Sequence, residues 1–178
     1  MRSFTCSIVL ATWFAGCGPF ENEFDTISFS PPTSASQGDA GVVAFAWPVE
    51  YRGITSWFRA HRKDHLHAGV DLEARQGDPI IAAAPGYVHS ARDRGYGYSA
   101  ITLVHGAGIA TVYGHVSRID VQRGAQVERG QVIGAVGGTP RTQGAGPDST
   151  GPHLHFEIHI GGFPVDPQAF LPGIGDSY

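Results

Sequence analysis

Hydrophobic and polar residues alternate strictly between His153 and Ile160, near the C-terminal end of the chain. Side chains on a β-strand point alternately to opposite faces. The pattern therefore predicts a strand whose apolar face packs on the core through Leu154, Phe156, Ile158 and Ile160. The opposite face would carry His153, His155, Glu157 and His159. Because imidazoles bind metals and transfer protons near neutral pH, this second face predicts a metal site.

Strand-like patterns also occur upstream of this segment. The folded domain is expected to begin with an extended apolar segment at residues 42–47. Residues 78–90 read as two strands around the turn Pro85-Gly86, because proline and glycine both favour turn conformations. These patterns indicate short strands joined by tight turns.

A further pair of β-rich segments, 99–105 and 109–115, flanks the sequence Gly106-Ala107-Gly108. A three-residue loop with glycine is typical of an antiparallel hairpin. We expect the second strand of this hairpin to present Tyr113 and His115 on one face.

Composition supports an all-β fold. The 178 residues include 25 glycines and 12 prolines, with 42% hydrophobic and only 16% charged residues, which suits short strands in a single domain with short appendages. Glycine turns around apolar strands at 77–80 and 124–134 look like those of lipoyl and biotin carrier domains. Such carriers need a modified lysine at the tip of a hairpin, but Lys63, the only lysine, lies outside both hairpins. We therefore expect the half-barrel architecture of these domains without their carrier function.

The charge and the cysteines narrow the function. A net charge of -4 gives no basic field for nucleic acid, so we expect no nucleic-acid partner. Cys6 and Cys17 both precede the predicted domain, so a metal there must bind to histidine and carboxylate. All nine histidines lie between His61 and His159.

The N-terminal segment has the order of an export signal. Residues 1–16 contain Arg2, an apolar run and two small residues before Cys17, as in a bacterial lipoprotein signal, although Phe14 replaces the usual leucine. We expect Cys17 to be lipidated and residues 17–41 to form a flexible tether to a domain at 42–172, followed by a tail at 173–178. The alternative is an ordinary secreted protein with an incidental Cys17.

Three groups of residues are candidates for chemistry. His67 and Asp71 are four apart, which suits a zinc site, although a surface ion pair gives the same pattern. His153 and His155 can both bind one ion, or one can bind while the other contacts a metal-bound water. His115 becomes a candidate only if it lies beside these histidines. Five further histidines are interpreted as loop, rim or supporting residues: His61, His65, His89, His105 and His159. Of these, His105 and His159 are expected on strands and could line a cleft.

Taken together, these segments resemble the lysostaphin-type zinc endopeptidases, which cut peptide cross-links in bacterial cell walls. The resemblance covers residues 45–171. It rests on segments in the family's order: Trp47-Pro48, HLHAGVDL at 65–72, the AAPGYV segment expected to form a hairpin, TVYGHVSRI at 111–119, the RGQVIGAVGGT turn, GPHLHFEI at 151–158 and the closing 162–167.

The resemblance implies one zinc ion held by His67, Asp71 and His155, with His115 and His153 as the catalytic pair beside an activated water. It also implies an antiparallel sheet with flanking hairpins, a hybrid of half-barrel and sandwich that forms an open groove. The expected activity is hydrolysis of peptide cross-links by a monomer, anchored through its N-terminal lipid in the outer membrane and facing the periplasm.

Two departures from the family pattern concern the walls of the groove. Arg59 stands in the stretch Ser56–Arg62 where the family often has glycine, and the loop 137–151 is extended by about six residues at Pro140–Ala145. Because loops beside a site commonly set specificity, the sequence does not identify the peptide bond that is cut. The rival functions are a non-catalytic wall-binding or hydrolase-activating module and a secreted metal-binding protein.

Overall fold

The computed structural model describes residues 43–173. The predicted signal segment, Cys17 and the tether lie outside these residues, as does most of the predicted tail. No helix within the described range is long and apolar enough to cross a membrane.

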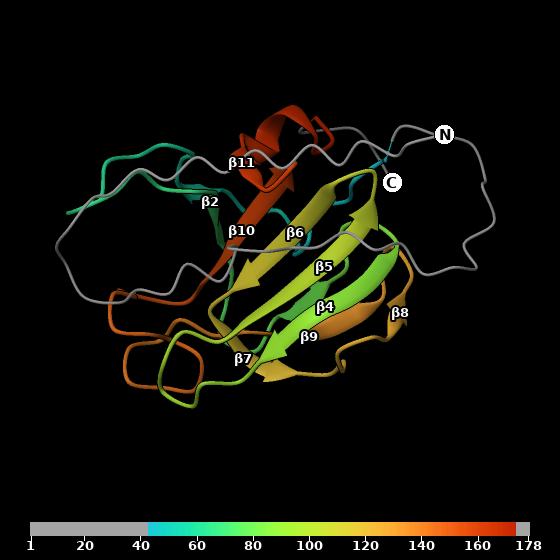
Figure 1. The fold of residues 1–178 in the computed structure, drawn as a ribbon. Helices are drawn as coiled ribbons and strands as arrows, with labels where there is room; N and C mark the ends of the chain where they lie inside the picture. Colours follow the sequence, from blue (N-terminus) through green and yellow to red (C-terminus); the bar gives the residue numbers. More distant parts are fainter. Residues whose placement is uncertain (1–42, 174–178) are drawn as a thin grey trace, which may run out of the picture.

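The main sheet has eight strands and is antiparallel throughout (Figure 1). Its strands are β1 (Ile54–Ser56), β2 (Val70–Glu73), β4 (Gly86–Arg92), β5 (Ala100–Gly106), β6 (Ile109–Gly114), β8 (Gln126–Val127), β10 (His153–Ile160) and β11 (Phe163–Val165). They follow the order β1-β2-β10-β6-β5-β4-β8, and β11 pairs with β10. The predicted all-β class with antiparallel pairing is confirmed.

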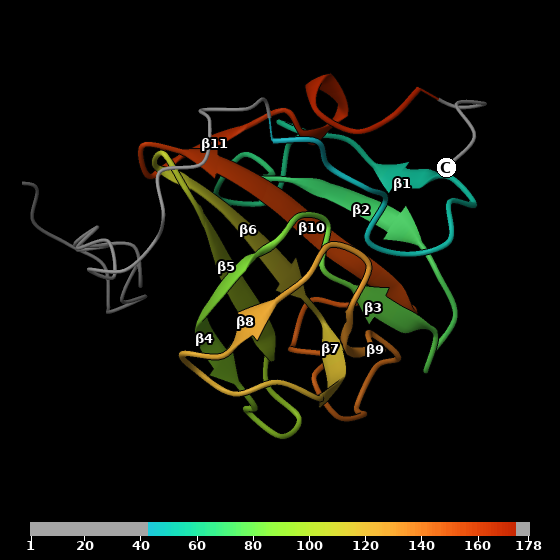
Figure 2. The same cartoon turned by 90° about the vertical axis from the view of Figure 1, so that its right-hand side faces the viewer.

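A second, smaller sheet contains β3 (Pro79–Ile81), β9 (Val132–Val136) and β7 (Val116–Ile119), in that order. Figure 2 shows it beside the long strands of the main sheet. The hydrophobic core includes Ile80 and Ile133 of the small sheet together with Ile101 of the main one, all fully buried. A short 3-10 helix, η1 (Pro167–Ala169), follows β11 and is capped by the Asp166 carboxylate.

Strand β10 has the bounds that its alternation predicts. Leu154, Phe156 and Ile158 are fully buried, as expected for the core face. Ile160 was expected on that face too, but 39% of it is exposed. It pairs with Phe163 in the β10–β11 hairpin, where Phe163 is itself 75% exposed, so the strand has already passed the edge of the core.

The hairpin of β5 and β6 is confirmed, but its turn is tighter than expected. Gly106 pairs with Ile109, which leaves Ala107 and Gly108 as a two-residue turn. Both residues have positive φ angles, 48° and 75°, the conformation that short hairpin turns with the right twist require.

Two other strand predictions were wrong in detail. Strands β3 and β4 do not pair with each other, because β3 pairs with β9 in the small sheet and β4 with β5 and β8 in the main sheet. The described part of the segment 42–47 is not a strand. Its Ala46 N–H donates to Ala83 O, and Phe45 and Trp47 are buried in the core, which explains its apolar sequence.

The prediction that Tyr113 and His115 share a face was also wrong. Strand β6 ends at Gly114, and His115 has a left-handed φ of 57°, which breaks the alternation of the strand. Tyr113 is fully buried against Phe156 in the core, whereas the ring of His115 lies beside that of His153.

Candidate metal centre

Two neighbouring strands of the main sheet and the segment before one of them carry the candidate ligands, and a third strand lies beside them. Asp71 of β2 lies opposite His155 of β10, and His155 lies opposite Gly114 of β6. Residues directly opposite in an antiparallel pair share a face of the sheet. His67, four residues before Asp71, reaches the same face from the turn that leads into β2.

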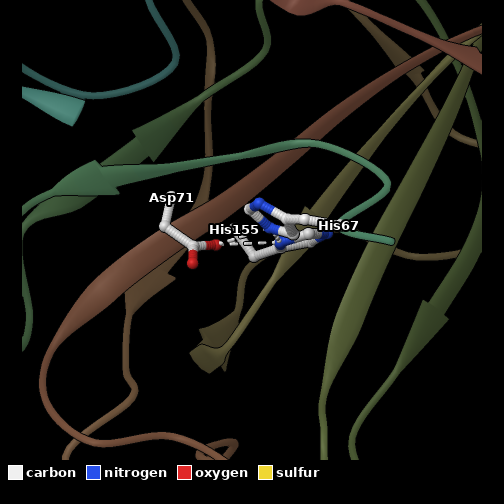
Figure 3. Close-up of side chains that lie close together, drawn as sticks. All are labelled: His67, Asp71 and His155. Carbon is white, nitrogen blue, oxygen red and sulfur yellow. Dashed lines mark hydrogen bonds and ion pairs between the residues drawn. The ribbon is translucent and has the colours of Figure 1, made fainter. Parts of the chain in front are cut away.

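The side chains of His67, Asp71 and His155 converge, each offering one ligand atom within 4.8 Å of the others. Figure 3 shows the three side chains pointing toward one another. Asp71 Oδ1 is 3.1 Å from His67 Nε2 and 3.0 Å from His155 Nδ1, and the two nitrogens are 2.9 Å apart. All three residues are buried, so a surface ion pair is excluded as the explanation of the His67–Asp71 spacing.

Both imidazoles are held by the nitrogen that does not face Asp71. His67 Nδ1 is 2.8 Å from Trp57 O, and His155 Nε2 is 2.7 Å from Glu157 Oε1. A ring that donates through one nitrogen keeps the lone pair of the other for a metal ion. Two imidazoles and a carboxylate are a donor set suited to catalytic zinc, which leaves one tetrahedral position open. The residues therefore fit the ion that the family resemblance implies.

Glu157 and His159, which share the predicted polar face of β10, lie behind His155. The two carboxylate oxygens of Glu157 separately contact His155 Nε2 and His159 Nε2, at 2.7 and 2.5 Å. Both residues are buried on the same face of β10. Both residues therefore support the candidate ligand His155, and Glu157 also lines the pocket.

The charges of this cluster shift its pKa values in opposite directions. Burial opposes ionisation of Asp71, but hydrogen bonds from His155 and His67 hold the pKa of Asp71 well below its usual range. The same balance of burial and imidazole hydrogen bonds lowers the pKa of Glu157 to about 2. For His155, burial is outweighed by hydrogen bonds to Asp71 and Glu157, which raise its pKa to about 9.

His115 and His153 lie next to the cluster, with ring centroids 4.4 Å apart. The Nδ1 of His115 is 2.8 Å from Ala145 O, and that of His153 is 2.8 Å from Gly151 O. His153 Nε2 is 3.8 Å from Asp71 Oδ1. Burial, followed by the charges of His153 and His155, lowers the pKa of His115 to about 4, so His115 is neutral near pH 7.

Sequence reasoning missed Arg62 as part of the site. Its guanidinium donates to Asp71 Oδ2 at 2.7 Å, the carboxylate oxygen that does not face the two imidazoles. The pair fixes the orientation of Asp71 and leaves Oδ1 for the centre. No spacing rule connects an arginine in a loop to a carboxylate nine residues later, so the only hint in the sequence was its position beside the histidine motif.

The other histidines lie away from the cluster of ligands. His65 is an exposed partner of Asp64 on the rim, and His61 forms an isolated bridge with Leu66. His105, which was thought able to line a cleft, makes structural hydrogen bonds to Pro85 O and Thr111 Oγ1.

A pocket of about 650 Å³ opens over the cluster, as the predicted groove requires. Arg62, Lys63, Asp64 and His65 line it on the side of the loop that precedes β2, and Asp148 and Thr150 line it from the extended loop. The extended segment also reaches His115 through the carbonyl group of Ala145. Both loops that depart from the family pattern therefore border the pocket.

Two imidazoles and a carboxylate at the floor of a pocket in an all-β fold form a candidate metal centre with one coordination position open. The sequence model of peptidase family M23 matches residues 65–167, and the chain belongs to this family of peptidoglycan endopeptidases. The recognition of a lysostaphin-type peptidase from the sequence is confirmed.

Individual relatives support the assignment. The DD-carboxypeptidase/endopeptidase Mpg of Neisseria meningitidis serogroup B is 42% identical over 126 residues, which cover 67% of this chain and 27% of the relative. Lysostaphin from Staphylococcus simulans has a TM-score of 0.61 at 28% identity, covering 76% of this chain and 56% of its own. A zinc-containing peptidase from Vibrio cholerae has a TM-score of 0.58 at 34% identity, covering 68% and 38%.

Proposed function

We propose that this protein is a zinc-dependent endopeptidase that hydrolyses peptide cross-links of bacterial peptidoglycan. The observation that carries the proposal is the convergence of His67, Asp71 and His155 at the floor of a pocket that also exposes His115 and His153. The chain spans about a quarter of the Neisseria relative, which is named as a DD-carboxypeptidase and endopeptidase. That relative supports the class of substrate.

When bound, zinc would polarise the scissile carbonyl group and lower the pKa of a water molecule. The protein's own contribution is proton transfer and orientation. His115 and His153 each have Nδ1 held by a backbone carbonyl group, so each ring exchanges a proton only at Nε2. Hydrolysis of a peptide bond takes one proton from water and gives one to the leaving amine. The two histidines are proposed to carry these protons.

A non-catalytic wall-binding module with the same fold is the alternative. Such a module would have no need of a buried set of ligands held by Glu157 and Arg62, nor of His115 and His153 beside it. The retention of this whole arrangement supports hydrolysis.

The test is digestion of isolated sacculi by the purified, zinc-loaded protein, with released muropeptides identified by mass spectrometry. We expect release by the wild type, its loss after chelation, and its loss in His155→Ala. His115→Ala should lose activity while it retains zinc. No release by the wild type, or equal release by His155→Ala, would contradict the proposal. The products also identify the bond that is cut.

We further propose that Cys17 carries a lipid that anchors the domain in the cell envelope, facing the peptidoglycan. The small residues before Cys17 and the polar segment that follows it support this placement. Metabolic labelling with a fatty acid should mark the wild type but not Cys17→Ala. Equal labelling of the two proteins would contradict lipidation at this position.

A further inference from the structure

Tyr98 is an aromatic residue of the pocket to which the preceding proposal gives no role. It lies in the connection between β4 and β5 and lines the pocket together with the candidate ligands. Its ring makes edge contacts with His115, at 4.9 Å between centroids, and with His155, at 6.4 Å. Tyr98 therefore contacts a candidate catalytic residue and a candidate ligand at once.

Gly114 explains how the phenol enters the site. A Cβ atom at Gly114 would lie 2.0 Å from the Tyr98 hydroxyl, so the hydroxyl occupies the place that a side chain at this position would take. Gly114 is the direct partner of His155 across β6 and β10. Such partners have Cβ atoms about 5 Å apart on one face. The phenolic oxygen thus lies beside His155, on the face that carries the ligands.

The backbone of Tyr98 is held by the extended loop. Tyr98 forms an isolated bridge with Ala145, whose carbonyl group also accepts from His115, and Gly146 lies against its Cβ atom. The residue as a whole is 36% exposed and lines the pocket, and its hydroxyl lies over Gly114. The backbone bridge and the ring contacts with His115 and His155 thus position the side chain beside the pocket.

The hydroxyl has the chemistry of a donor. Burial raises the pKa of Tyr98 well above its ordinary value, and the charges of Glu157 and Asp71 add to this effect, so the phenol stays protonated. A protonated phenol fixed beside a reaction centre can donate to an oxygen that gains negative charge, without any proton being transferred.

We propose, on the basis of the proposed peptidase function, that Tyr98 is a catalytic residue whose phenolic O–H donates a hydrogen bond to the scissile carbonyl oxygen as negative charge develops on it. This assigns charge stabilisation to Tyr98 and leaves proton transfer to His115 and His153. No bond of Tyr98 breaks in the step, because the phenol keeps its proton.

The experiment compares Tyr98→Phe with the wild type on a purified cross-linked muropeptide dimer. Tyr96→Phe is the matched control, because Tyr96 lies in the same connection, is 75% exposed and does not line the pocket. Removal of one such donor should lower kcat by about 100- to 1,000-fold with KM little changed. Zinc affinity and Tm should be those of the wild type, and Tyr96→Phe should retain full activity.

Several results would overturn the role of Tyr98. These are a kcat of Tyr98→Phe within about threefold of the wild type, a loss that falls on KM alone, or a matching loss of zinc affinity that reveals a purely structural role. If the wild type itself cleaves nothing, the proposed function fails and this role fails with it. Cleavage by the wild type with an unaffected Tyr98→Phe overturns the role of Tyr98 alone.

Discussion

The imidazole of His155 and the carboxylate of Glu157, two residues apart on one face of β10, form a buried hydrogen bond of 2.7 Å between Nε2 and Oε1. A carboxylate behind a histidine ligand fixes its ring orientation and increases its basicity. His159 holds the other oxygen of Glu157, so the carboxylate is itself oriented. At the proposed metal site, Glu157 is therefore expected to influence metal affinity without contact to the ion.

Glu157→Gln should weaken zinc binding by about 10- to 100-fold, because the amide keeps the shape of the side chain but loses the charge. Competition with a chromophoric chelator measures the change. Glu128→Gln alters an exposed glutamate far along the chain and is the control. Equal zinc affinities for Glu157→Gln and the wild type would show that the carboxylate does not tune the site.

Zinc binding should release a proton from His155. In the metal-free protein the pKa of His155 is raised to about 9, so at pH 7 the ring carries protons on both nitrogens, and Nδ1 must lose its proton to bind a metal. Apparent zinc affinity should therefore rise by about tenfold for each pH unit between pH 7 and 9 and then level off. Calorimetry in buffers of different ionisation enthalpy counts the proton. An affinity that is flat over this range would contradict the prediction.

Arg59→Gly should stabilise the protein. Arg59 has a left-handed φ of 60°, which costs a non-glycine residue about 1–2 kcal/mol, while glycine loses about 0.5–1 kcal/mol through its freer unfolded chain. The expected gain is about 0.5–1 kcal/mol in the free energy of unfolding, measured by denaturant titration. Arg129→Gly, in an exposed turn and without a positive φ, should be destabilising. Stabilisation by both changes would exclude relief of strain as the cause.

Tyr113→Phe should destabilise the domain while it leaves the pocket intact. The Tyr113 hydroxyl accepts hydrogen bonds from Ala83 N at 2.9 Å and from Thr111 Oγ1 at 3.0 Å in a fully buried setting. Its removal leaves a buried N–H group without a partner, at a cost of about 1–3 kcal/mol. A lower Tm with unchanged zinc affinity is the expected result. An unchanged Tm would mean that the N–H group finds another partner.

The sequence predicted β10 well because its two faces differ so strongly in polarity. Alternation placed His155 correctly relative to Phe156, and the spacing of four brought His67 and Asp71 to one site. These features are local. The identities of the bound ion and of the catalytic pair come from the resemblance to known peptidases and stay predictions.

What the sequence missed depends on contacts between distant segments or on local backbone geometry. Arg62 and Tyr98 reach the site from loops, and no periodicity describes where a loop places a side chain. The positive φ of His115 reversed its expected face, since a strand pattern assumes extended backbone to its end. The hairpin expected of β3 and β4 does not form, because the two strands on either side of the turn belong to different sheets. A turn in the sequence does not show whether the strands that flank it pair with each other.

The register between β2 and β10 joins Asp71 to His155 across 84 positions of the chain. A slip of one residue would turn one of the two side chains to the opposite face of the sheet. An ion bound by both side chains would act as a reversible cross-link that closes a long loop and stabilises the folded state in which the two strands pair. Correct strand pairing and occupation of the site are thermodynamically linked, so each strengthens the other.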